Sequence, residues 1–112
     1  MAAFHNEDER IAWSVAESLM EKGRTMMQAA ETALEAFLVG KELTRQRCLR
    51  RGIGATDAEI RWNETADAKK ALADNSFNVT QANMYYGAAA AFYSRASYLR
   101  GCGEPQHHHQ HR

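Results

Sequence analysis

Residues 82–93 have the sequence Ala-Asn-Met-Tyr-Tyr-Gly-Ala-Ala-Ala-Ala-Phe-Tyr, in which ten of the twelve positions are apolar or aromatic. At about 3.6 residues per turn, so many apolar side chains cannot share one stripe of a helix. The run of alanines at 88–91 permits close approach of a neighbouring helix, and the larger side chains supply the area that makes burial favourable. The stretch therefore predicts a helix that is covered on more than one side and lies at the centre of a helical assembly.

The composition extends this expectation to the whole chain. With 112 residues, 45% of them hydrophobic and 25% charged, the chain has the size and balance of one globular domain. The single proline, Pro105, leaves all earlier segments free to be helical. Because alternating β-branched runs are missing as well, we expect an all-α protein with one helical domain over residues 1–103.

The first helix is expected over residues 7–51. Asn6 and Glu9 have the spacing of a capping box, in which each side chain satisfies a backbone amide of the first turn. An apolar stripe of helical period follows it, at Ile11, Val15, Leu19 and Met26. Gly23 either lies inside this helix or ends it. An interior glycine costs only about 1 kcal/mol relative to alanine, so continuity is favoured, and Gly23→Ala is then expected to raise stability.

The clearest boundary is the turn that follows Arg50 and Arg51. Gly52 is suited to the end of a helix, and Thr56 with Glu59 forms a second capping box that opens a helix over residues 57–100. Polar residues around Asn75 either interrupt this second helix or lie within it. If both uncertain points are continuous, the two helices form a long antiparallel hairpin, each about 66 Å long. If both are breaks, the same segments form a compact four-helix bundle.

The hairpin has a definite expected register, because its two helices have nearly equal length and a tight turn joins them. Residue i then faces approximately residue 108 − i. The pairs expected from this register are Val15 with Tyr93, Leu19 with Ala89 and Met26 with Ala82. All three pairs are apolar, which is the pattern that a packed hairpin requires.

The charges balance to a formal net charge of zero but are not evenly distributed. Residues 43–52 carry only basic charges, and with one arginine of the next helix they form a candidate site for nucleic acid or another anion. We call this set the arginine tip: Arg45, Arg47, Arg50, Arg51 and Arg61. The simpler interpretation, which we favour, is that these arginines complement the dipole at a helix C-terminus.

Motifs for catalysis are missing from the sequence. No histidine occurs between His5 and His107, so neither Cys48 nor any serine has a base in a known arrangement. The His-rich segment 104–112 fits no structural zinc spacing, and we expect a flexible tail, either native or an added tag. We therefore expect no enzyme activity, cofactor or metal. Neither a signal peptide nor a membrane span is expected, so we place the protein in the cytoplasm or within an assembled particle.

The excess of apolar side chains in residues 82–93 is the main functional indication. A single partner helix covers only one side of this stretch, so part of its surface is left for an interface. The residues expected there are Met84, Tyr85, Ala88, Ala91 and Phe92. We expect a non-enzymatic structural component that self-associates through this surface, for example in a viral or phage particle. The alternatives are a small inhibitor that binds a partner protein and a nucleic-acid-binding module that uses the arginine tip.

Overall fold

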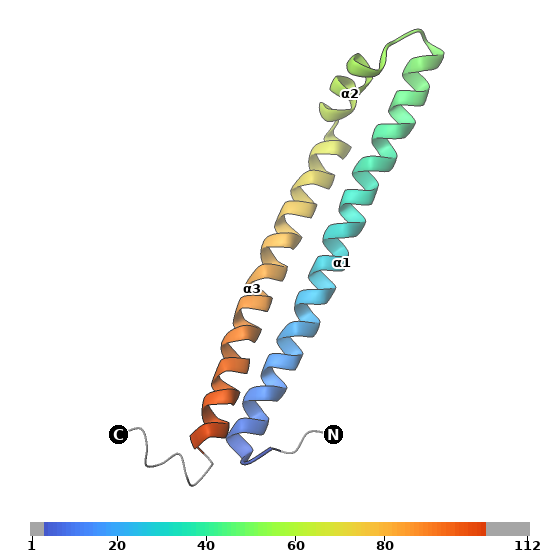
Figure 1. Ribbon diagram of the computed structural model, residues 1–112. Coiled ribbons are helices and arrows are strands. Elements are labelled where there is room, and N and C mark those ends of the chain that lie inside the picture. The colour runs from blue at the N-terminus through green and yellow to red at the C-terminus, as the bar shows by residue number, and fades with distance from the viewer. Residues whose placement is uncertain (1–3, 103–112) are drawn as a thin grey trace. The chain divides into compact units, whose positions relative to one another are not determined.

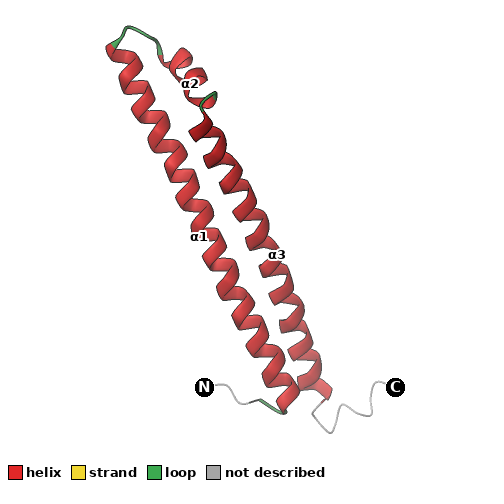
Figure 2. Cartoon of the chain, turned by 180° about the vertical axis from the view of Figure 1, so that it is seen from behind, coloured by secondary structure: helices red, strands yellow, loops and turns green. Residues whose placement is uncertain are grey.

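The computed structural model describes residues 4–102, and these form three helices. They are α1 (Glu7–Arg50), α2 (Ala55–Asn63) and α3 (Ala66–Cys102). Figures 1 and 2 show α1 running antiparallel to α2 and α3 from two sides. No strand occurs between residues 4 and 102. The predicted all-α antiparallel hairpin is confirmed.

The contacts of the chain fall into two compact units. The first unit comprises the described residues up to Arg24 together with those from Ala82 onward, and the second comprises Thr25–Gln81. The first unit thus pairs the beginning of α1 with the end of α3. The second unit pairs the end of α1 with α2 and the beginning of α3.

The predicted cap at the start of α1 is present in a different form. Asn6 Oδ1 accepts the backbone N–H of Glu9 at 2.7 Å, as expected. The Glu9 carboxylate, however, accepts the N–H of His5 at 2.6 Å and lies 3.8 Å from the Arg100 guanidinium of α3. Asn6 also donates to the backbone oxygen of Leu99 at 3.3 Å. These contacts join the start of α1 to the end of α3 within the first unit.

The end of α1 is set by Gly52, as predicted. The N–H of Gly52 bonds to the Leu49 oxygen at 3.0 Å, and the N–H of Ile53 bonds to the Cys48 oxygen at 2.8 Å. This is the Schellman arrangement, and it requires a residue with positive φ after the helix. Gly52 has a φ of 80°, which glycine adopts at little cost because it has no β-carbon.

The predicted start of the second helix is wrong. The residue before α2 is Gly54, which provides no side-chain cap, and Thr56 lies inside the helix rather than at its end. The expected capping box of Thr56 and Glu59 is therefore not formed. Glu59 instead pairs with Lys41 of α1 at 3.2 Å, so its carboxylate links α2 to α1.

A break that the sequence did not predict separates α2 from α3 at residues 64–65. The Thr65 hydroxyl donates to the Trp62 carbonyl at 2.7 Å and accepts the N–H of Ala68 at 3.1 Å. One side chain thus satisfies both the end of α2 and the start of α3. The single helix predicted over residues 57–100 is consequently two helices.

The two points at which the four-helix alternative required breaks are both helical. α1 is continuous through Gly23 and α3 is continuous through Asn75, so the four-helix alternative is wrong. Asn75 has a different function in the second unit, where its amide donates to the backbone oxygen of Ala30 on α1 at 2.8 Å. A partly buried polar contact of this kind favours one register of two paired helices over others.

Small residues form the buried lines of both long helices. On α1 they recur every seven residues, at Ala16, Gly23 and Ala30, and on α3 the corresponding line is Ala82, Ala89 and Ala96. Seven residues are close to two helical turns, so each line follows one side of its helix. No large side chain is fully buried among the described residues. The large apolar side chains therefore flank these lines or face solvent.

The register at the first unit agrees with the prediction. Tyr93 contacts the Trp13 ring at a centroid distance of 4.8 Å and donates a hydrogen bond to Glu17. These two residues flank Val15, the residue that the predicted register places opposite Tyr93.

Candidate functional site

An exposed apolar surface lies on one side of the first unit. On α3, Met84, Ala88 and Phe92 recur every four residues, and Met84 and Phe92 are 62% and 38% exposed. On α1, Ile11 and Val15 have the same spacing, and Ile11 is 46% exposed. Side chains four residues apart are neighbours on a helix, so each set forms a stripe.

One cation–π contact places the two stripes on the same side. The Lys22 ammonium lies 6.0 Å from the ring centroid of Tyr85. Lys22 follows Ile11 by eleven residues, about three helical turns, and Tyr85 adjoins the α3 stripe. We call the surface formed by Ile11, Val15, Met84, Tyr85, Ala88 and Phe92 the apolar face.

The residues predicted for an interface have different positions relative to this face. Met84 and Phe92 are exposed on it, and Tyr85 and Ala88 are partly buried where it meets α1. Ala91 is also exposed, but helical geometry directs it away from α1, at the outer edge of the face.

The contribution of α1 to this face is not evident from the sequence, which predicts that Ile11 belongs to the buried stripe. The structure buries Ala12 and Ala16 instead, since small residues let α3 approach closely. Ile11, Val15 and Lys22 are spaced so that they share one side of α1. A stripe drawn through Lys22 instead of Leu19 would have indicated that this side faces away from the core.

The opposite side of the first unit is covered by an aromatic cluster. The Trp13 ring contacts Phe4 at a centroid distance of 6.3 Å and meets Tyr93 edge to face. The Tyr93 hydroxyl donates to the Glu17 carboxylate, and this hydrogen bond, followed by burial, raises the pKa of Tyr93. This side of the unit thus has a satisfied polar pair, Tyr93 and Glu17.

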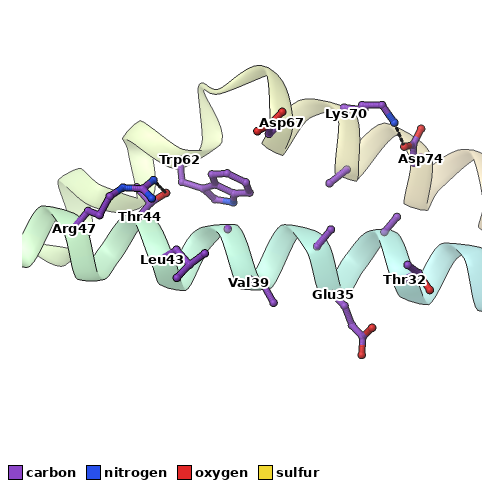
Figure 3. Close-up of a pocket in the computed structure, with 14 residues that line it drawn as sticks. Thr32, Glu35, Val39, Leu43, Thr44, Arg47, Trp62, Asp67, Lys70 and Asp74 are labelled. Carbon is purple, nitrogen blue, oxygen red and sulfur yellow. Dashed lines mark hydrogen bonds and ion pairs between the residues drawn. The ribbon is translucent and has the colours of Figure 1, made fainter.

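The second unit contains an open groove of about 720 Å³ between α1 and the α2–α3 segment, shown in Figure 3. Trp62 lines the groove from α2, and its ring packs over Gly40 and lies 5.6 Å from the Phe37 ring. The indole nitrogen of Trp62 is buried and has no hydrogen-bond partner. Val39 and Leu43 of α1 border the groove and are 58% and 50% exposed.

The arginine tip lies entirely in the second unit, but its members have different environments. Arg45 forms two hydrogen bonds with Glu42, at 2.9 and 2.6 Å, and these, together with a hydrogen bond from Gln46, lower the pKa of the Glu42 carboxyl to about 2. Arg47 donates to the Thr44 hydroxyl at 3.4 Å. Arg50, Arg51 and Arg61 are exposed, and neither they nor Arg47 form an ion pair with any described residue. The structure thus leaves four of the five guanidinium groups without an ion pair in the described part of the chain.

The residues relevant to catalysis and metal binding are dispersed. Between residues 4 and 102 no group of three or more His, Cys, Asp or Glu side chains is positioned to hold a metal ion. Cys48 is a buried thiol, and the His-rich segment 104–112 lies outside the described residues. No helix in the described part of the chain is long and apolar enough to cross a bilayer.

Comparisons with protein-family models, with curated proteins and with solved structures give no match to this chain.

Proposed function

We propose that the protein is a non-enzymatic structural component that self-associates through the apolar face of its first unit. The observation that carries this proposal is the pairing of two exposed apolar stripes on one side of that unit. An apolar surface built from both helices is typical of an interface, whereas single exposed apolar residues are common on any protein. A second copy that presents the same face would form a four-helix arrangement with the large side chains at its centre.

The composition of the core supports this proposal. In the described part of the chain, nine of the eleven buried apolar residues are alanines, which remove little apolar area from water on folding. Leucine, isoleucine, methionine and phenylalanine side chains remain exposed instead. A small helical domain needs extensive burial of such side chains to offset its conformational entropy. Association would supply that burial, so we expect folding and assembly to be linked.

A component of a larger assembly, such as a virion, fits these properties. The inhibitor alternative uses the same apolar face with a different protein, and it predicts a monomer until that protein is present. The nucleic-acid alternative is favoured by one observation, the four exposed arginines of the tip that have no ion-pair partner among the described residues.

The double variant Met84→Glu/Phe92→Glu tests the proposal, because both side chains are exposed in the isolated chain. We expect it to have a lower solution mass than the unmodified protein while keeping its helical circular dichroism. Ala90→Glu is the matched control, since Ala90 is exposed on α3 but two residues from Ala88, on another side of the helix. A double variant with the mass of the parent protein would contradict the proposal.

A further inference from the structure

The second unit exposes apolar side chains on two opposite sides. On α1, Leu34 precedes Leu43 by nine residues, which places the two side chains about 180° apart around the helix. Leu43 borders the groove, so Leu34 lies on the other side of the helix pair. Leu38 and Leu34 are one turn apart and therefore share that side.

The α3 segment has the same division. Lys70 and Asp74 border the groove, and Leu72 lies between them in sequence, about 160° away around the helix from each. Leu72 adjoins the buried line of Ala68 and Asn75, so it belongs to the side of Leu34 and Leu38. These three leucines are 42%, 51% and 45% exposed. We call Leu34, Leu38 and Leu72 the leucine ridge.

The two sides differ in shape. The groove is lined in part by small residues, Ala33, Ala36, Gly40 and Ala71. Figure 3 shows the Trp62 ring extending from α2 toward α1. The leucine ridge consists of three long side chains that project from their helices. The core of a protein interface is packed about as densely as a protein interior. Two grooves placed face to face would leave a void, and two ridges would pack poorly, so neither arrangement meets this requirement. A ridge set into a groove avoids both defects.

We infer that the leucine ridge of one copy occupies the groove of another copy. The contact is heterologous, since it joins two different surfaces of the same chain, and the resulting pair still presents one free ridge and one free groove. Repetition gives a ring or an open chain of copies rather than a closed dimer. This inference rests on the proposed self-association and adds a second contact of different symmetry.

The groove side and the ridge side each carry charges of both signs. Lys70 and Asp74 pair at 2.6 Å, whereas Glu35, Arg47 and Asp67 border the groove without an ion-pair partner among the described residues. On the ridge side, Glu31 and Lys69 are exposed and likewise form no ion pair with a described residue. Glu31 precedes Leu34 and Lys69 precedes Leu72 by three residues, so each lies next to the ridge. A contact that places Lys69 beside Asp67 would bring opposite signs together.

Complementation between two variants tests the inference. The ridge variant is Leu34→Glu/Leu38→Glu, and the groove variant is Val39→Glu/Leu43→Glu; all four side chains are exposed, so the fold should persist. Both are made in the Met84→Glu/Phe92→Glu background, which removes the apolar-face contact. Ala73→Glu, at an exposed outward position of α3, is the control in the same background.

In that background we expect the control to gain mass with concentration and each of the two variants to be monomeric alone. An equimolar mixture should form a 1:1 heterodimer, because one variant retains the groove and the other retains the ridge. Light scattering with one variant fused to a larger tag measures the mass of the mixture directly.

Homodimers of either variant would overturn the inference in favour of like-with-like contacts. A mixture that stays monomeric would overturn it outright. Failure of the proposed function is seen separately, as an unchanged mass when Met84→Glu/Phe92→Glu is introduced.

Discussion

The indole ring of Trp62 lies directly on the backbone of Gly40. A β-carbon at residue 40 would overlap the Cη2 atom of Trp62 and lie 2.5 Å from its Cζ2 atom. Trp62 is only 7% exposed and also contacts the Phe37 ring, so it has little room to move. The contact with Gly40 fixes α2 against α1 beside the groove of the second unit.

Gly40→Ala should therefore destabilise the protein by about 2 kcal/mol, even though alanine is the better helix former. Thermal or urea denaturation followed by circular dichroism measures the change. Gly87→Ala is the matched control, because Gly87 is also helical but a β-carbon there would meet open space. The control should gain about 0.5–1 kcal/mol. Equal gains at both positions would show that Trp62 does not pack as described.

Gly23→Ala should also be destabilising, which reverses the expectation from the sequence. The helix is continuous at Gly23, as predicted, but a β-carbon there would be 2.5 Å from Cε1 of Tyr86. Tyr86 is partly exposed and its ring can turn aside, so we expect a loss smaller than that of Gly40→Ala. In a Tyr86→Ala background the same substitution should become neutral or stabilising. A stabilising Gly23→Ala in the unmodified chain would rule out this contact.

The features that were predictable from the sequence depend on residues close together in the chain. The cap at Asn6 and the helix end at Gly52 each involve backbone groups within five positions, and both are present. The break at Thr65 gave no such signal, because threonine is also common inside helices. Thr65 is recognisable as a capping residue only once α2 is known to end beside it, where its hydroxyl donates to the Trp62 carbonyl.

The candidate site was predictable only in part. The outward position of Met84 and Phe92 followed from an excess of apolar residues on one helix. The exposure of Ile11 could not be predicted, because it depends on how closely α1 and α3 approach. That distance is set by alanines, which are inconspicuous in an apolar stripe. The groove could not be predicted, since it requires Trp62 and Gly40 to meet across the turn.

The hydrogen bond between Tyr93 and Glu17 should make stability depend on pH in the alkaline range. It raises the pKa of Tyr93 in the folded protein, so its contribution is fully present below the unfolded value of about 10. The contribution is lost as the pH rises through the raised pKa. We expect Tyr93→Phe to narrow the difference in melting temperature between neutral and alkaline solution. An unchanged difference would mean that this hydrogen bond does not form in solution.

The arginine tip should bind nucleic acid weakly and without sequence preference. Arg45 is already engaged by Glu42, so only part of the basic charge is available. We expect a dissociation constant no tighter than about 1 µM for a single-stranded RNA at physiological salt. The measurement is fluorescence anisotropy, with Arg47→Gln/Arg50→Gln/Arg51→Gln for comparison. Nanomolar binding that this triple variant abolishes would establish the nucleic-acid alternative instead.

The central claim is that the apolar face of the first unit is covered by a second copy of the chain. Its most direct test is the solution mass of the unmodified protein, measured by light scattering from low to high micromolar concentration. We predict a mass above the 12.6 kDa of one chain, rising with concentration. A constant mass of one folded chain up to high micromolar concentration, with no other protein present, would contradict the claim.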